Sequence, residues 1–243
     1  MLGRLFGGRV HVGQLMHINR MVTAVVRIRY YYLVKIRKRL RVLDSAKASE
    51  NAVSHNLRNL LLGPAGLRSL KLIRPVSVIE GLGPIESQKL LSIGPRSEAE
   101  IFRLWAHGYQ LSNIRGLDLI SYSPWIDLGD MHAMPYADSS FDVVLCGWVL
   151  AYSEKKKDAI QEIIRVLRSG GVAAIGVEYN RKSDQELIKE DGYLAGSRQR
   201  LTSTQTILDL FDSHVDHVYV DHGIVPGVND ERGNLVVVLS IKK

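Results

Sequence analysis

The sequence predicts an α/β fold with a mostly parallel sheet, and two observations point to it. From residue 76 onward, short apolar runs alternate with longer segments whose apolar residues recur at helical spacing. Strands that alternate with helices form a parallel sheet. The last two apolar runs, 216–221 and 234–241, are separated only by a loop rich in Pro, Gly and Asn. Because no helix joins them, we expect an antiparallel hairpin at one edge of the sheet.

Turn and cap residues set the limits of the elements in this part of the chain. Gly94-Pro95 ends the first buried strand, Ser97 is suited to cap the helix that follows, and Gly170-Gly171 closes a later helix. The expected strands are 89–93, 113–120, 141–146, 172–179, 216–221 and 234–241. The expected helices are 97–107, 154–168 and 202–211, the last capped at Thr202 or Ser203.

The first 75 residues differ from the rest of the chain in charge. They hold 15 Lys and Arg residues against two acids, Asp44 and Glu50, whereas residues 76–243 are acidic overall. The overall charge of +7 therefore combines a basic arm with an acidic body. We expect a basic, mainly helical extension at 1–75 and a separate domain at 76–243.

Helical periodicity is visible along the arm. From Leu15 to Leu43, apolar residues recur at near-helical spacing opposite a basic face, and Arg29 is the one exception on the apolar side. A strand-like alternation also exists between Val22 and Ile36, but strands usually stop at 4–8 residues, so we favour a helix. A second helix is expected over 46–62, and a short one over 67–73 before Pro75.

Composition excludes several classes of protein. With 46% hydrophobic and 23% charged residues, the chain can bury a core, which excludes wholesale disorder. One cysteine, Cys146, excludes an internal disulfide framework and a Cys-rich zinc site, and no residue spacing suggests a metal. We expect no membrane span and no secretory signal, since Arg27 and Arg29 interrupt the apolar start. The Arg-rich start fits a transit peptide but has no Ser before Ser45. We expect a cytoplasmic protein, with a peripheral position at a membrane as the alternative.

The most specific motif lies in Gly129–Val177. It reads GDMHAMPYADSSFDVVLCGWVLAYSEKKKDAIQEIIRVLRSGGVAAIGV. An acidic residue is followed by Pro-aromatic, then Ser-Phe-Asp at the start of a strand, then a helix that ends in Arg-Val-Leu-Arg-Ser-Gly-Gly before another strand. This run resembles class I S-adenosylmethionine-dependent methyltransferases, in particular the small-molecule branch related to ubiquinone-biosynthesis methyltransferases. The resemblance covers 89–178 directly and implies a Rossmann-like doubly wound sheet of about seven strands that ends in an antiparallel hairpin.

The resemblance implies S-adenosylmethionine as the cofactor, held where doubly wound sheets bind ligands, at the carboxyl ends of the strands. There Asp118 can accept both ribose hydroxyls. By resemblance, Asp130 accepts the adenine amine and Met131 packs on the ring. The full set of expected cofactor contacts follows the order of strands that the resemblance implies. They are Gly94, Pro95 and Arg96 after the first strand, Asp118 and Leu119 at the second, Asp130 and Met131 after the third, and Gly147 and Trp148 after the fourth.

Two departures from the family pattern affect this site. The family's Gly-x-Gly-x-Gly loop is here Gly94-Pro95-Arg96, with one glycine; Arg96 could pair with the cofactor carboxylate, or the site could be degraded. The interval from Asp118 to Asp130 is too short for the family's usual helix. We therefore expect the ribose and adenine edge to be more open, or to be covered by Tyr122 or Trp125.

For catalysis we single out His132 as a general base for an oxygen acceptor, and Tyr152 and Glu178 as substrate contacts. The expected function is O-methylation of a small-molecule, carbohydrate or lipid-linked acceptor. The alternatives are a non-catalytic methyltransferase-like binding or scaffold protein, and an RNA methyltransferase that uses the basic arm. For the arm, a lid or packing on its own domain ranks first, an anionic membrane surface second and nucleic acid third.

Overall fold

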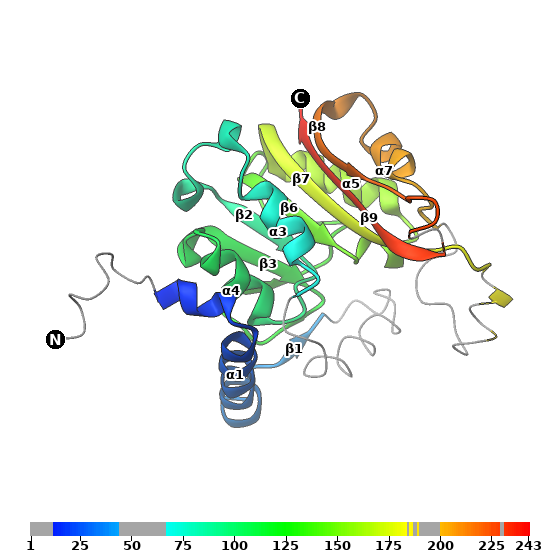
Figure 1. Ribbon diagram of the computed structural model, residues 1–243. Coiled ribbons are helices and arrows are strands. Elements are labelled where there is room, and N and C mark those ends of the chain that lie inside the picture. Colours follow the sequence, from blue (N-terminus) through cyan, green and yellow to red (C-terminus); the bar gives the residue numbers. More distant parts are fainter. Residues whose placement is uncertain (1–11, 44–66, 184, 187–188, 190–199, 229–230) are drawn as a thin grey trace, which may run out of the picture.

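The computed structural model describes residues 12–43, 67–183, 185–186, 189, 200–228 and 231–243 (Figure 1). A seven-stranded sheet with the order β5-β3-β2-β6-β7-β9-β8 forms its centre. The first five strands in this order are parallel, and β9 is antiparallel to both β7 and β8. The Rossmann-like doubly wound fold with an antiparallel hairpin is thus confirmed. The strands are β2 (Leu90–Ile93), β3 (Ile114–Asp118), β5 (Ile126–Leu128), β6 (Phe141–Gly147), β7 (Leu167–Asn180), β8 (Val215–His222) and β9 (Arg232–Ile241).

Helices cover both faces of this sheet. α3 (Leu70–Val76) and α4 (Glu98–Ala106) enclose one hydrophobic core, and α5 (Lys156–Val166) and α7 (Thr204–Phe211) enclose the other. Adjacent strand residues such as Leu90 and Leu91 are both fully buried, one in each core, because successive side chains point to opposite faces. This explains why the central strands read as continuous apolar runs. Short 3-10 turns connect the elements: η4 (Glu80–Leu82), η5 (Ile85–Ser87), η6 (Leu111–Asn113), η7 (Leu150–Tyr152) and η8 (Asp212–His214).

Helix starts follow the predicted caps, whereas some ends differ. The Ser97 side chain accepts a hydrogen bond from the Ala99 amide at the start of α4, and Ser203 forms a capping box with Thr206 at the start of α7. The short helix expected before Pro75 is α3, but Pro75 lies inside this helix and does not follow it. The helix continues past Pro75 because Val76 is buried in the same core as the rest of α3. The helix expected over 154–168 ends at Val166, since β7 already begins at Leu167.

The segment after β3 departs from the predicted strand 113–120. β3 ends at Asp118, and β4 (Ile120–Ser121) leaves the main sheet to pair antiparallel with β1 (Arg41–Val42) from the arm. The Leu43 amide also donates to the Leu119 carbonyl oxygen at 2.9 Å. As expected, residues 119–125 contain no helix. A short strand that binds the arm thus lies in the interval where the resemblance implies a helix.

The arm packs against the domain. It contains η2 (Val12–His17, a 3-10 helix), α1 (Asn19–Tyr30) and η3 (Tyr31–Ile36, a π-helix). The preference for helix over strand is confirmed, but the helix ends at Ile36 and not at Leu43. The predicted helix 46–62 lies outside the described residues. Three arm residues, Met16, Val22 and Val26, form a separate core with Ala99, Phe102 and Ala106 of α4.

Two expectations about this arm have different outcomes. Its packing on its own domain is confirmed by the contact with α4, whereas the unit boundary at residue 75 stays a prediction, since α3 runs across it. In the described part of the chain, no helix is long and apolar enough to cross a membrane.

Candidate functional site

Gly94 occupies a position that no other residue could take without strain. The ends of β2 and β6 lie level, because Ile93 pairs with Cys146. Directly after them, Gly94 has a φ of +70°, and a Cβ added there would lie 2.2 Å from Cγ1 of Val149. Both the left-handed backbone and the close approach of Val149 require glycine. The chain thus makes a tight turn at the switch point of the sheet, where the strand order reverses.

The amides of this turn are bonded within the protein. The Arg96 amide donates to Oδ2 of Asp118 at 2.9 Å, and Arg96 itself has a φ of +56°. The Gly94 amide donates to the Leu117 carbonyl at 2.8 Å, and the Ser97 amide donates to the Pro95 carbonyl at 2.5 Å. The predicted residues Gly94, Pro95 and Arg96 therefore lie at the expected place. A backbone cradle for a ligand would need these bonds to rearrange, which leaves the Arg96 side chain as the group that could reach one.

Asp118 lies at the end of β3 with its carboxylate facing the same turn. It is buried, and its Oδ1 accepts the Ile120 amide at 3.2 Å. Burial raises the pKa of Asp118 to about 6, although the Arg96 and Ile120 amides oppose this shift. Each carboxylate oxygen accepts one of these two amide bonds, and the Leu119 amide also interacts with the group. The lone pairs that remain are acceptors, which is what ribose hydroxyls need.

His132 lies in a hydrogen-bonded chain with Asp130 and Ser153. His132 Nδ1 lies 2.5 Å from Oδ1 of Asp130, and His132 Nε2 lies 2.7 Å from Oγ of Ser153. Because a carboxylate only accepts, Nδ1 carries the proton and Nε2 presents its lone pair to the Ser153 hydroxyl. Ser153 Oγ in turn accepts the Lys155 amide at 2.9 Å. The imidazole is thus held in the tautomer that a general base needs.

The other oxygen of Asp130 remains available. The hydrogen bond from His132 lowers the pKa of Asp130, which keeps this carboxylate ionised. Within the described ranges, its Oδ2 accepts no hydrogen bond from the protein. Met131 is half-buried against the core beside it. This pair therefore fits the predicted roles of accepting an adenine amine and packing on its ring.

Trp148 is fixed by contacts on several sides. It has a φ of +61°, its amide donates to the Gly176 carbonyl at 2.7 Å, and its Nε1 donates to Oδ1 of Asn234 at 3.0 Å. The guanidinium of Arg68 lies 4.5 Å from its ring centroid. Gly147 before it faces α3, since an added Cβ would lie 3.2 Å from Leu72.

Glu178, predicted to contact substrate, is bound by two arginines. Its carboxylate lies 2.5 Å from Nη2 of Arg68 and 2.8 Å from Nε of Arg232. Burial alone would raise the pKa of Glu178, but the hydrogen bonds from the two arginines outweigh it and lower the pKa. This charge is already paired, so substrate would meet a structural ion-pair cluster here and not an isolated carboxylate.

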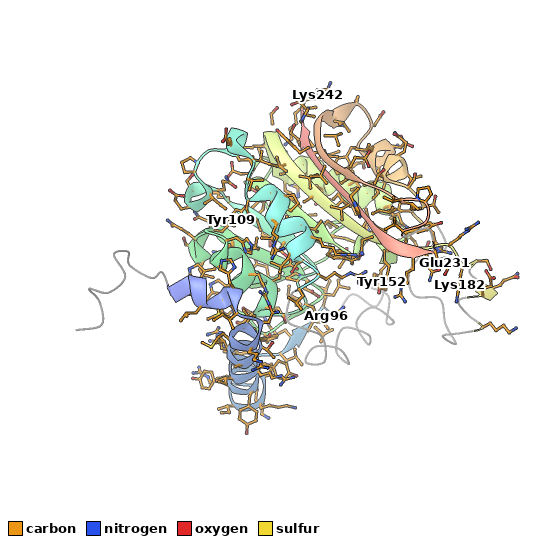
Figure 2. The ribbon with its side chains drawn as sticks, in the orientation of Figure 1. Arg96, Tyr109, Tyr152, Lys182, Glu231 and Lys242 are labelled. Carbon is orange, nitrogen blue, oxygen red and sulfur yellow. The ribbon has the colours of Figure 1, made fainter. Side chains whose placement is uncertain are left out.

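Tyr152 lies in η7, which follows β6, and its side chain is partly exposed. Figure 2 shows Tyr152 and Arg96 at the same edge of the sheet, on the side where the parallel strands end. The structure thus brings Tyr152 to the expected edge but gives it no described contact with His132. The residue next to it, Ser153, is the one that contacts His132, and its role was not predicted.

The arm packs on α4 and on the segment between β3 and β5. Arg29 donates to both carboxylate oxygens of Glu98, at 2.6 and 2.9 Å, and its guanidinium lies 4.7 Å from the Trp125 ring centroid. Tyr122 is buried, and its ring meets the edge of Tyr30 at 5.4 Å. The arm thus packs on Tyr122 and Trp125, whereas coverage of the ribose and adenine edge stays a prediction.

Comparisons with known proteins agree with this fold. A family model described as a methyltransferase domain matches residues 103–175. The N-methyltransferase NodS from Bradyrhizobium japonicum, solved with S-adenosyl-L-homocysteine, superposes with a TM-score of 0.54 at 16% identity, covering 80% of this chain and 100% of that one. A chain in the complex of the Haloferax volcanii Trm112 methyltransferase activator with a putative methyltransferase gives a TM-score of 0.52 at 14% identity, covering 79% and 95%.

A curated relative matches over a shorter stretch. Ribosomal RNA-processing protein 8 from Caenorhabditis briggsae is 34% identical over 100 residues. The match spans 40% of this chain and 30% of that protein's length. It therefore concerns a part of each protein only.

Proposed function

We propose that this chain, which has a Rossmann-like fold and a segment that matches a methyltransferase domain, is a class I S-adenosylmethionine-dependent methyltransferase that methylates an oxygen atom of its acceptor. The acceptor is a small-molecule, carbohydrate or lipid-linked hydroxyl compound, as in the small-molecule branch related to ubiquinone-biosynthesis methyltransferases. The chain of hydrogen bonds from Asp130 through His132 to Ser153 carries this proposal. An alcohol is a weak nucleophile until a base removes its proton, whereas an amine is already nucleophilic when neutral.

The residues at the carboxyl ends of the strands would hold the cofactor. Asp118 would accept the ribose hydroxyls, Asp130 would accept the adenine amine, and Met131 would pack on the ring. Arg96 would pair with the cofactor carboxylate. Once bound, the cofactor supplies an electrophilic methyl carbon on its sulfonium centre. The protein's main contribution is then to place the acceptor in line with that carbon.

His132 would take the acceptor's proton at Nε2. An acceptor hydroxyl that approaches the partly exposed imidazole replaces Ser153 as the partner of Nε2. Asp130 stabilises the imidazolium that forms, through its 2.5 Å contact with Nδ1. Ser153 acts as a positioning residue that holds the ring when no acceptor is bound. Tyr152 lines the approach to the same edge.

Two variants separate the binding of cofactor from the chemistry. Purified protein is titrated with S-adenosylhomocysteine by calorimetry, and methyl transfer is followed with radiolabelled S-adenosylmethionine and extracts that contain hydroxylated acceptors. Asp118→Ala should abolish binding. His132→Gln should bind normally but lose about 10²–10⁴-fold in transfer, the usual contribution of a general base. Transfer by His132→Gln at the wild-type rate, or a product methylated on nitrogen, would refute the oxygen assignment.

A second candidate is RNA methylation, which the match to a part of ribosomal RNA-processing protein 8 favours. The basic arm would then bind phosphates. Phosphate contacts make affinity fall steeply with salt, with a slope that counts the contacts. Methyl transfer to RNA that is lost when arm arginines are replaced would support this candidate. RNA binding that is weak and insensitive to salt would exclude it.

A third candidate, a non-catalytic scaffold, is favoured by the bonded amides of the turn after β2 and by the burial of Asp118. It predicts that S-adenosylhomocysteine does not bind. Binding in the micromolar range by calorimetry, lost in Asp118→Ala, would argue against it.

A further inference from the structure

Several large apolar side chains of the arm are exposed beside the ones that pack on the domain. Val22 and Val26 of α1 are buried against α4, so the inner face of the helix is already satisfied. In contrast, Ile28, Tyr31 and Ile36 are 69%, 62% and 57% exposed. We call the surface formed by Ile18, Met21, Ile28, Tyr31, Tyr32 and Ile36 the outer face of the arm. Single exposed apolar residues are normal, but five on the consecutive helices α1 and η3, with Ile18 directly before α1, suggest an interaction site.

The same surface is strongly basic. Residues 12–43 contain eight Lys and Arg residues and no acid. In the described part of the chain only Arg29 of these forms an ion pair, with Glu98. Arg20, Arg27 and Lys35 are exposed, and their spacing places them on the side of the outer face. The outer face therefore combines apolar groups with uncompensated positive charge.

We propose that the outer face of the arm docks the protein on an anionic membrane surface. A basic amphipathic helix that lies in the interface buries its apolar side chains at the boundary of the acyl chains, while its cations meet anionic headgroups. Tyrosines suit this depth because the ring is apolar and the hydroxyl is polar. Nucleic acid explains the surface less well. It would use the cations, and aromatic rings could stack on bases, but the exposed isoleucines would gain nothing.

The outer face belongs to the segment that borders the site. Arg29 contacts Glu98 directly after the turn at Gly94, and the Leu43 amide bonds to the carbonyl of Leu119, next to Asp118. In Figures 1 and 2, α1 projects from the edge of the sheet where Arg96 lies. Docking therefore turns this edge toward the bilayer. Within the proposed function, on which this last step rests, it favours a lipid-linked acceptor over a freely diffusing one.

Vesicle sedimentation with the full chain tests the docking itself. The probes are vesicles of phosphatidylcholine alone and of phosphatidylcholine mixed with phosphatidylglycerol. We expect binding to the anionic vesicles, weakened by salt. Arg20→Gln with Arg27→Gln should lower the partition coefficient about 30-fold, from about fivefold per cation near the surface. Ile28→Ser with Tyr31→Ser should lower it by about tenfold or more.

Matched controls change the same chemistry elsewhere. Lys157→Gln with Lys242→Gln removes two exposed cations outside the arm, and Val78→Ser with Val228→Ser removes two apolar side chains that are 76% and 78% exposed. Neither control should change vesicle binding by more than about twofold. Calorimetry with S-adenosylhomocysteine on every variant separates this test from that of the proposed function, since docking does not require the cofactor.

Three results would overturn the proposal. One is no sedimentation with anionic vesicles. Another is binding to a single-stranded RNA oligonucleotide that is tighter than binding to anionic vesicles and that the Ile28→Ser and Tyr31→Ser changes leave unaltered. This result would assign the surface to nucleic acid. A third is sedimentation without vesicles that the same two changes abolish, which would assign the surface to contact between copies of the chain.

Discussion

The buried carboxyl group of Asp118 should make cofactor affinity depend on pH. Burial raises the pKa of Asp118 to about 6. Only the ionised carboxylate has lone pairs left for ribose hydroxyls after it has accepted the backbone amides around it. A proton on Asp118 therefore competes with the ribose. We expect the affinity for S-adenosylhomocysteine to fall as the pH drops below about 6.

The size of this effect follows from the pKa. With a pKa of about 6, the ionised fraction of Asp118 falls from about nine-tenths at pH 7 to about one-tenth at pH 5. The dissociation constant should rise about tenfold over this range, or about 1.4 kcal/mol. Isothermal titration calorimetry at a series of pH values measures it. Asp118→Asn, which cannot ionise, should bind weakly and lose the pH dependence.

Without cofactor, the same group has the opposite effect on folding. Its folded pKa lies above the ordinary value of 3.8, so its contribution to stability is fully present below about pH 4 and is lost as the pH rises through about 6. The free energy of unfolding should fall by up to about 3 kcal/mol between these limits, relative to Asp118→Asn. An affinity that stays flat from pH 5 to 7, in protein shown to be folded by circular dichroism, would refute the assignment of Asp118 to the ribose.

Three further predictions concern single side chains. Arg29→Ala leaves the buried carboxylate of Glu98 unpaired and should lower the free energy of unfolding by about 3 kcal/mol in denaturant titrations. The double variant Arg29→Met with Glu98→Gln removes both charges and should recover most of this loss. Equal losses in the two variants would contradict the pairing. Gly94→Ala places a Cβ against Val149 at a left-handed backbone position and should lower the melting temperature. The additional change Val149→Ala should restore only part of the melting temperature, because the strain in φ remains. His132→Gln should lower kcat for methyl transfer by about 10²–10⁴-fold with unchanged S-adenosylhomocysteine affinity; a loss of affinity with unchanged kcat would assign His132 to binding instead.

Local sequence signals were sufficient for six of the seven strands of the central sheet, whereas β5 (Ile126–Leu128) was not among the expected strands. The buried strands and their helices were predictable because periodicity, Ser caps and Gly turns are all read within a few residues. The shortened interval after Asp118 correctly indicated that a helix is absent. The ends of elements were less predictable. Pro75 inside α3 and the early start of β7 follow from burial of Val76 and Leu167, which depends on the rest of the fold.

Arg29 shows most clearly what the sequence left open. By spacing it falls on the apolar side of α1 and looks like a defect in the pattern, whereas in the fold it pairs with Glu98, 69 residues away. Ser153 gave no signal either, because its partner His132 lies 21 residues away on another segment. The pairing of β1 with β4 was likewise missed, since two-residue strands carry no periodicity.

The sequence by itself determined the class of fold, the alternation of strands and helices along the chain and the position of Asp118 at the end of a strand, because these depend on short-range patterns of apolar and turn residues. The tertiary structure decided where the arm lies, that Asp118 is buried, and that His132 is held between two hydrogen-bonding partners. These features depend on contacts between distant segments, which form only when burial of the common core brings the segments together.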